Sequence, residues 1–163
     1  MSHYLEHTRE PREELAAAWQ VLEPGGALLI EVPDPESRLR HVLGRFWIPW
    51  FQPQHQHLLS VTNLERLFRE EGFEPVRWQR GEAHQPVDFL LGAMLAMRAF
   101  RPLPDTPWRA PQPTHLRFAA AATFWAGVPL LVGAWIVDHL AAPLLRRAGW
   151  SNTYRVVARK VAP

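Results

Sequence analysis

Four histidines are the residues of this chain best suited to proton transfer or metal binding. They are His7, His55, His57 and His84, and histidine is the residue type most often used as a general base or metal ligand near neutral pH. His55 and His57 are two residues apart, so on a strand their side chains would share a face and could bind one ion. Because no third ligand is evident near this pair, we predict no metal site. The chain has no cysteine, which excludes a thiolate nucleophile and a cysteine-based zinc site.

Composition limits the number of domains and the class of partner. The 163 residues are 47% hydrophobic, which suits one buried core and gives no sign of two full domains. Seventeen of the eighteen basic residues are arginine, since Lys160 is the only lysine, but the net charge is only +2. The basic residues are interspersed and form no run with interleaved aromatics, so we predict no nucleic-acid partner.

The chain is organised around residues 22–33, in which a helix ends and a buried strand begins. Pro24, Gly25 and Gly26 can form the helix stop and tight turn, because glycine adopts positive φ values readily. Ala27 to Val32 is almost continuously apolar, which predicts a strand covered on both faces in a parallel α/β sheet. Before it, Pro11 starts an amphipathic helix of about three turns.

An aromatic, proline-interrupted stretch follows this strand after a short helical pattern at residues 39–43. Phe46, Trp47, Trp50 and Phe51 are separated by prolines and do not suit a regular helix. A loop at the carboxyl end of a parallel strand is where α/β sheets usually bind ligands. We therefore assign Trp47, Trp50, His55, His57 and His84 to substrate binding. The alternative is that the aromatic side chains only cap the core.

A second helix-to-strand unit lies between residues 62 and 80. Thr62 and Glu65 form a Thr-x-x-Glu pattern that predicts a capping box at the start of a helix. Gly72 suits the left-handed position that ends this helix, and Phe73 to Arg80 alternates enough to predict a strand.

The order of these motifs resembles the second half of a class I S-adenosylmethionine-dependent methyltransferase. The motifs are Ser-His-Tyr-Leu-Glu-His from Ser2, Glu-Pro-Gly-Gly before the strand, His-x-His-Leu-Leu from His55, and Glu-Gly-Phe ending at Phe73. In that family the Ser-His-x-Leu-Glu-His run follows the fourth strand. The Pro-Gly-Gly turn precedes the fifth strand, and the Gly-Phe leads into the sixth strand. Tyr154 to Lys160 resembles the closing seventh strand. The resemblance implies an α/β fold, a partial Rossmann-like methyltransferase sheet with strand seven antiparallel between strands five and six.

The resemblance also implies parts that this sequence does not contain. The glycine-rich loop and the acidic residue that hold the cofactor in that family are absent, and there is no Gly-x-Gly elsewhere. Strands one to four would lie before Met1, which would leave the edge of Ala27 to Val32 unpaired. We therefore expect the C-terminal portion of a longer enzyme, and no measurable binding of S-adenosylmethionine by this chain alone.

The family's site would fall on the first residues of the chain. The resemblance places Glu6 and His7 at the methyl-transfer cleft, where His7 could take a proton from a hydroxyl as the methyl group arrives. Ser2 and His3 would lie beside the cofactor. The alternative for His7 is that it only caps a turn.

Residues 81–152 form an apolar insertion before the last strand. An apolar helix is predicted from Pro86 to Phe100, and Phe118 to Val137 gives twenty residues without a charge. As a helix this run would be about 30 Å long, enough to cross the hydrocarbon core of a bilayer. We expect a membrane-embedded or interfacial hairpin with Trp108, Trp125, Trp135 and Trp150 near the headgroups. The alternative is a pair of buried helices that extend the core or form a dimer face.

The resemblance implies methyl transfer with S-adenosylmethionine as the methyl donor, and the apolar insertion suggests a small, apolar or lipid-linked acceptor. The expected organisation is a methyltransferase segment at 1–80, the hydrophobic helical insertion at 81–152 and a closing strand at 153–163. The expected location is the cytoplasmic face of a membrane or the cytoplasm. A homo-oligomer is a further possibility. The alternative is a non-catalytic, membrane-associated interaction module or the product of a decayed gene.

Overall fold

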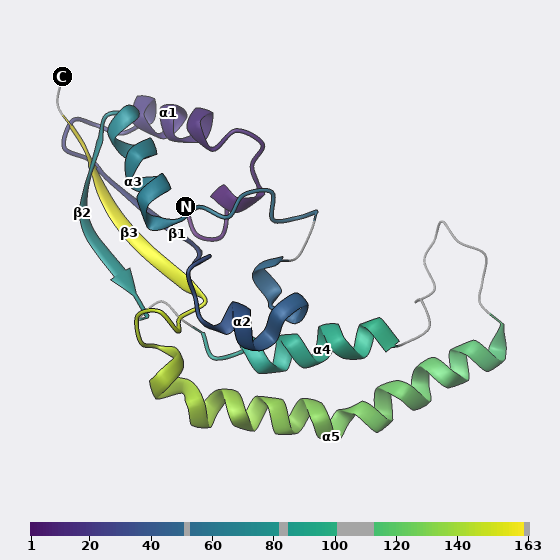
Figure 1. Ribbon diagram of the computed structural model, residues 1–163. Helices are drawn as coiled ribbons and strands as arrows, with labels where there is room; N and C mark the ends of the chain where they lie inside the picture. Colours follow the sequence, from purple (N-terminus) through teal and green to yellow (C-terminus); the bar gives the residue numbers. More distant parts are fainter. Residues whose placement is uncertain (51–52, 82–84, 101–112, 162–163) are drawn as a thin grey trace.

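The protein is built on a three-stranded sheet whose middle strand is the last one in the chain. The computed structural model describes all residues except 51–52, 82–84, 101–112 and 162–163. Strands β1 (Ala27–Pro33) and β2 (Phe73–Arg80) both pair antiparallel with β3 (Thr153–Lys160), so the order is β1-β3-β2. The predicted three strands and their order are confirmed (Figure 1).

One face of the sheet carries the main hydrophobic core. Helices α1 (Pro11–Val21) and α3 (Val61–Glu70) lie on the same side of the sheet (Figure 1). Alternate strand residues point toward them, as expected from the two-residue period of a strand. The buried members of this core are Leu5, Leu15, Ala18, Leu28, Ile30, Val32, Leu64, Phe68, Phe73, Tyr154, Val156 and Ala158.

The turn before β1 forms at the two predicted glycines, but only Gly25 takes the positive φ that was expected of both. Gly25 has a φ of +77°, and the Gly26 N–H donates to the Glu23 carbonyl over 2.8 Å. A Cβ added at Gly26 would lie 2.8 Å from that same carbonyl oxygen, which is closer than real side chains approach. Glycine is therefore required at position 25 for its positive φ and at position 26 because a side chain would not fit.

The second face of β1 is more open than its apolar sequence indicates. Ala27 is exposed and Leu29 keeps 43% of its surface accessible, whereas Glu31 is buried and accepts a hydrogen bond from Arg155 over 2.5 Å. The prediction of a strand covered on both faces is therefore wrong for the described chain. The apolar run is continuous, but only alternate members reach the core.

The free edge of β1 is partly covered by the first residues of the chain. Ser2 forms a parallel bridge with Glu31, the His3 N–H donates to the Glu31 carbonyl over 2.9 Å, and the Glu31 N–H donates to the Met1 carbonyl over 3.0 Å. The prediction of an unpaired edge is therefore wrong at Leu29 to Glu31, because Met1–His3 pairs with β1 there like a short neighbouring strand.

The start of α3 also differs from its prediction. Its N-cap is Ser60, whose extended backbone lets the side chain accept a hydrogen bond from the Asn63 N–H over 3.3 Å. Thr62 lies inside the first turn, and Glu65 pairs with Arg69 over 2.5 Å instead of closing a capping box. At the other end, Gly72 has a φ of +80°, so the predicted left-handed residue after this helix is confirmed.

The insertion between β2 and β3 is a long helical hairpin. Helices α4 (Asp88–Phe100) and α5 (Thr114–Leu145) lie side by side and project away from the sheet (Figure 1). The predicted run at 118–137 is therefore the middle of a longer helix of 32 residues, about 48 Å long at 1.5 Å per residue. The thioether of Met97 fills the space where a Cβ at Gly127 would lie, so glycine allows the two helices to approach closely.

A smaller hydrophobic cluster joins the root of the hairpin to the segment after β1. That segment contains α2 (Leu39–Leu43) and the short 3₁₀ helices η2 (Gly44–Phe46) and η3 (Ile48–Trp50). Leu39, Trp47 and Leu145 are fully or almost fully buried against one another. Trp47 is therefore a core residue, and its assignment to substrate binding is not supported by its place in the structure.

Two buried carboxylates lie at the root of the hairpin. Asp138 of α5 accepts hydrogen bonds from the Phe89 and Leu90 N–H groups over 3.0 and 2.8 Å, which satisfies donors in the first turn of α4. Asp88 begins α4 and accepts a hydrogen bond from Asn152 over 2.9 Å. Burial, with a further contribution from the nearby Asp138, raises the pKa of Asp88 from 3.8 to about 7.

We expect the stability of the protein to fall as the pH rises from about 4 to about 7, because unfolding lets Asp88 lose its proton at its lower, unfolded pKa. Asp88→Asn keeps an acceptor for Asn152 and cannot ionise, so it should remove this part of the decline. Urea unfolding at several pH values measures the difference between the two proteins. Glu74→Gln, at an exposed carboxylate, is the control and should follow the wild-type profile. Parallel profiles for wild type and Asp88→Asn would contradict the prediction.

Candidate functional site

Polar residues from the first residues of the chain, from the helix after them and from the loop that carries His55 meet near the carboxyl end of β1. Met1–His3 runs parallel to β1, so the residues that follow it, in the 3₁₀ helix η1 (Leu5–His7), emerge at the same end of the sheet. The carboxyl ends of parallel strands are where α/β folds place their ligands. Glu6 and His7 therefore lie where the resemblance predicts a cleft, beside the loop that carries His55.

Glu6, His7 and His55 form a compact cluster. One potential ligand atom from each residue lies within 4.8 Å of the other two, and the rings of His7 and His55 meet edge to face at 4.7 Å. Glu6 is 1% exposed, and its Oε1 lies 4.0 Å from His7 Nε2. Its Oε2 is buried and has no hydrogen-bond partner among the described residues.

The two histidine rings of this cluster are oriented by main-chain carbonyls. His7 Nδ1 lies 2.8 Å from the Gln54 oxygen, and His55 Nδ1 lies 2.9 Å from the Pro49 oxygen. A carbonyl can only accept a hydrogen bond, so each Nδ1 carries the proton. The basic nitrogen of each neutral ring is therefore Nε2, which in His7 lies on the side of Glu6.

His55 and His57 do not form the pair that their spacing suggests. Residues 55–57 are not in a strand, and His57 Nε2 lies 3.0 Å from the Arg9 carbonyl instead of joining His55. The Gln56 and His57 N–H groups donate to the Glu6 carbonyl over 2.7 and 3.2 Å, which holds this loop against η1. Trp50 is 42% exposed at the edge of Trp47, and His84 lies outside the described residues.

Ser2 and His3, the expected cofactor neighbours, lie between β1 and η1. Ser2 Oγ is 3.4 Å from Glu31 Oε1, and His3 lies between two carboxylates, with Nδ1 3.3 Å from Glu6 and Nε2 3.2 Å from Glu31. The hydrogen bond with Glu6 raises the pKa of His3. Since His3 also has a φ of +47°, which is uncommon for a residue other than glycine, its contacts hold a strained backbone.

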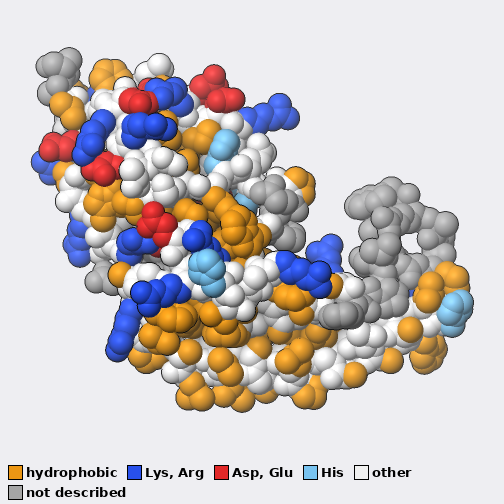
Figure 2. Space-filling model, in the orientation of Figure 1, with side chains coloured by type: hydrophobic (Ala, Val, Ile, Leu, Met, Phe, Trp, Pro, Cys, Tyr) orange, Lys and Arg blue, Asp and Glu red, His pale blue; other side chains and the backbone are white. Residues whose placement is uncertain are grey.

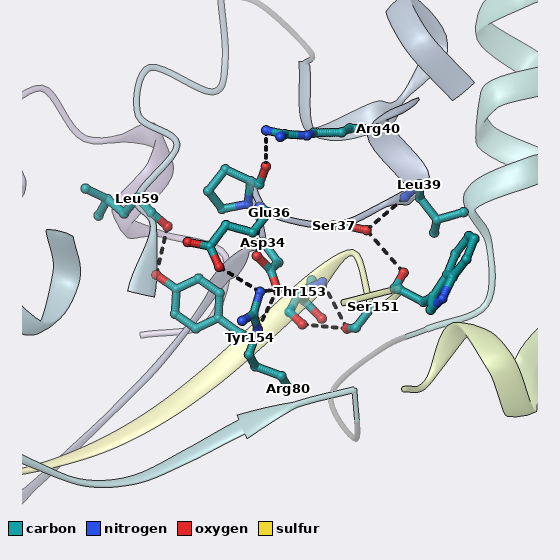
Figure 3. A network of polar contacts seen from close by, with 12 residues as sticks. Asp34, Glu36, Ser37, Leu39, Arg40, Leu59, Arg80, Ser151, Thr153 and Tyr154 are labelled. Carbon is teal, nitrogen blue, oxygen red and sulfur yellow. Dashed lines mark hydrogen bonds and ion pairs between the residues drawn. The ribbon is translucent and has the colours of Figure 1, made fainter. Parts of the chain in front are cut away.

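A second polar network, which the sequence analysis did not assign, links β1 to β2. Asp34 follows β1 and is fully buried, and its Oδ2 accepts two hydrogen bonds from Arg80 over 2.9 and 2.7 Å (Figure 3). Arg80 also contacts Glu36, and the neighbouring Tyr154 donates its hydroxyl to the Leu59 carbonyl (Figure 3). An acidic residue directly after a buried strand was the only signal of this network in the sequence.

Replacement of Arg80 by methionine should lower the free energy of unfolding by about 3 kcal/mol, because it leaves the buried Asp34 carboxylate without its cation. The double variant Arg80→Met/Asp34→Asn should recover much of this loss by removing the charge. Arg77→Met, at an exposed position of the same strand, is the matched control. Urea unfolding measures all three. Equal losses for the Arg80 and Arg77 variants would show that the pair does not stabilise the sheet.

Comparisons with known proteins agree with this arrangement over the first part of the chain. A family model described as "Methyltransferase domain" matches residues 1–77. No curated protein matches the chain in sequence.

Two solved structures are similar to the chain. One is a SAM-dependent methyltransferase from Archaeoglobus fulgidus, with 16% identity and a TM-score of 0.49 over 98% of this chain. The other is the [4+2]-cyclase SpnF, with 16% identity and a TM-score of 0.48 over 99% of this chain. The chain spans 57% and 48% of the lengths of these two proteins. The family match makes residues 1–77 similar to a methyltransferase domain, and the strand order β1-β3-β2 is the order that the resemblance implies for part of a methyltransferase sheet.

Proposed function

We propose that this chain is the C-terminal part of an enzyme that transfers a methyl group from S-adenosylmethionine to a small, apolar or lipid-linked acceptor. The observation that carries the proposal is the family match over residues 1–77, whose strands β1 and β2 are joined by β3 in the expected order. Methyl transfer depends mainly on aligning the donor with the acceptor, so no nucleophilic residue is required.

In this proposal His7 is the proton acceptor. Its Nδ1–H is held by the Gln54 carbonyl, so Nε2 can take a proton from an acceptor hydroxyl as the methyl group is transferred. Glu6 lies beside it, with Oε1 4.0 Å from His7 Nε2. Ser2 and His3, at the end of the segment that pairs with β1, would face the cofactor, and Trp50, His55, His57 and His84 would face the acceptor.

The cofactor itself would be held largely by residues that this sequence does not contain. No Gly-x-Gly occurs in the 163 residues, and such a loop is what lets a backbone approach a nucleotide closely. We therefore expect the chain alone to be inactive, with binding restored in a longer protein that includes the first strands.

Calorimetric titration of the purified chain with S-adenosylmethionine should give no measurable one-to-one binding. A protein extended at its N-terminus through the upstream reading frame should bind the cofactor, if that frame encodes a strand followed by a Gly-x-Gly loop. Tight one-to-one binding by the 163 residues alone would overturn the first expectation. An extended, folded protein that does not bind would favour the non-catalytic interaction module.

The class of acceptor is proposed from the surface of the α4–α5 hairpin. Helix α5 is long and apolar enough to cross a membrane by length and composition. An 18-residue window within this helix has a mean hydropathy of 1.8, and only 6% of that window is buried. Figure 2 shows hydrophobic side chains along α5, whereas most charged side chains gather over the sheet and the helices α1 and α3. The most exposed of its large apolar residues include Phe118, Trp125, Leu130, Val132, Trp135 and Leu140.

A lipid bilayer is the occupant that we propose for this surface. Tryptophan side chains favour the interface between headgroups and acyl chains, and Trp125 and Trp135 are 71% and 50% exposed. Asp138, the first acidic residue after the apolar run, is fully buried against α4 and so does not interrupt the exposed surface. The hairpin would lie in the plane of the cytoplasmic face, where the enzyme would meet a lipid-linked acceptor.

The chain should float with lipid vesicles on a density gradient, and Trp125→Glu/Leu140→Glu should stay at the bottom, because both changes place charge on the proposed contact surface. Val21→Glu is the matched control, since Val21 is 83% exposed but lies on α1, away from the hairpin. A wild-type chain that remains soluble without detergent and does not float would contradict the membrane role. A dimer that forms without lipid and is broken by the same two changes would assign the surface to a second copy of the chain.

A further inference from the structure

We propose that Glu6, His7 and His55 form a binding site for a divalent transition-metal ion such as Zn²⁺. The three residues come from η1 and from a loop about fifty residues later, yet one ligand atom from each lies within 4.8 Å of the others. In a tetrahedral site with bonds of about 2.0–2.1 Å, neighbouring ligand atoms are about 3.3 Å apart. His7 Nε2 and Glu6 Oε1 are already 4.0 Å apart, so small side-chain rotations would close the site.

The Glu6 carboxylate is the first argument for a cation at this place. Burying a carboxylate is costly unless it is paired, and Glu6 is 1% exposed with its Oε2 lacking any hydrogen-bond partner among the residues the structure describes. Its Oε1 contacts His3, whose own Nε2 is shared with Glu31. A divalent cation between Glu6 and the two imidazoles would neutralise this buried carboxylate.

The orientation of the histidines is the second argument. Metal-ligating histidines usually donate their other ring N–H to a carbonyl or carboxylate, which fixes the tautomer and aims the ligating nitrogen. His7 and His55 both place Nδ1 on a main-chain carbonyl, those of Gln54 and Pro49. The ring arrangement is therefore set before an ion arrives.

The scaffold around the three residues is held by main-chain hydrogen bonds. The Glu6 carbonyl accepts from Gln56 and His57, and the His7 carbonyl lies 3.4 Å from the Gln56 side-chain nitrogen. These bonds join η1 to the loop just after His55, and the contact of His7 Nδ1 with the Gln54 carbonyl joins it just before His55. The positions of all three ligands thus depend on one hydrogen-bonded junction between η1 and the loop.

The ligand set indicates the kind of ion and the state of the site. Two imidazole nitrogens and one carboxylate oxygen favour Zn²⁺ and similar transition metals over Mg²⁺ or Ca²⁺, which prefer oxygen ligands throughout. The His7 side chain is 40% exposed, so water can reach the ion and complete its coordination. Three protein ligands with one open position are typical of zinc sites that act on a bound water or hydroxyl.

This site goes beyond the proposed methyl transfer and does not depend on it. An ion on His7 Nε2 would occupy the lone pair of that nitrogen, which could then not accept a proton from an acceptor hydroxyl. The two roles of His7 are therefore exclusive, and a direct measurement of metal binding separates them without any assay of activity.

The test is a titration of the metal-free chain with Zn²⁺ against a competing chelator, repeated with Co²⁺ to record its visible absorption. We expect one-to-one binding, with an affinity that falls at least tenfold in His7→Asn, His55→Asn and Glu6→Gln. His57→Asn is the matched control, because its Nε2 is directed to the Arg9 carbonyl and not to the cluster, and its affinity should stay within twofold of wild type.

Glu6→Gln keeps the inference falsifiable if a histidine variant fails to fold. Glutamine has nearly the same shape and no charge to bury, so this variant should be at least as stable as wild type without metal but should gain no thermal stability from Zn²⁺. Absence of one-to-one binding, or equal affinity in wild type and Glu6→Gln, would overturn the site. A loss of affinity in His57→Asn as large as that in His7→Asn would also overturn the site, because it would indicate that histidines bind the ion without regard to their position.

Discussion

The whole structure depends on β3 reaching the centre of the sheet from the end of the chain. Its pairs with β1 join residues far apart in sequence, such as Ala27 with Arg159, and without it β1 and β2 would be two separate strands. Lys160 fixes its end, because the ammonium group donates to the Trp19 and Leu22 carbonyls over 2.7 and 2.8 Å and lies over the Trp19 ring. These carbonyls lie in the last turn of α1 and at the residue that follows it, where the helix offers no further donors. The only lysine of the chain thus joins the last strand to the first helix.

The same strand explains how the sheet accepts a long helical insertion. Arg80, at the end of β2, is paired with Tyr154, near the start of β3, so the two ends of the insertion lie next to each other. Gly81 contacts the Arg146 carbonyl so closely that no side chain would fit there. The buried carboxylates Asp88 and Asp138 lie at this junction, and both are tied to hydrogen-bond donors at the base of α4 or before β3. The hairpin can therefore project from the sheet without disturbing its pairing.

The local elements were predictable from sequence because glycine, proline and apolar spacing act over a few residues. Gly25, Gly26 and Gly72 end the helices and turns as expected, and the bounds of β2 agree with the prediction. The wrong predictions occur where two neighbouring residues can fill the same role, or where contacts with distant segments determine whether a residue is buried. Ser60 and Thr62 can both cap α3, and Ser60 takes the role because its backbone is extended. Leu29 is predicted to be buried because it lies in an apolar run. Its exposure depends on which distant elements cover the sheet, and the neighbouring residues do not determine this.

The candidate site was only half predictable for the same reason. Glu6 and His7 could be placed at the end of the sheet through a family resemblance, but their contact with His55 depends on main-chain bonds that leave no pattern in the sequence. One short segment also connects the site to the hairpin. Pro49 of η3 orients His55 through its carbonyl, while η3 itself packs against α4 and the neighbouring Trp47 is buried against Leu145 of α5. A shift of α4 and α5 would therefore move the carbonyl that aims His55. The aromatic stretch 46–50 thus contributes to the site through packing, although its sequence suggests direct contact with a ligand.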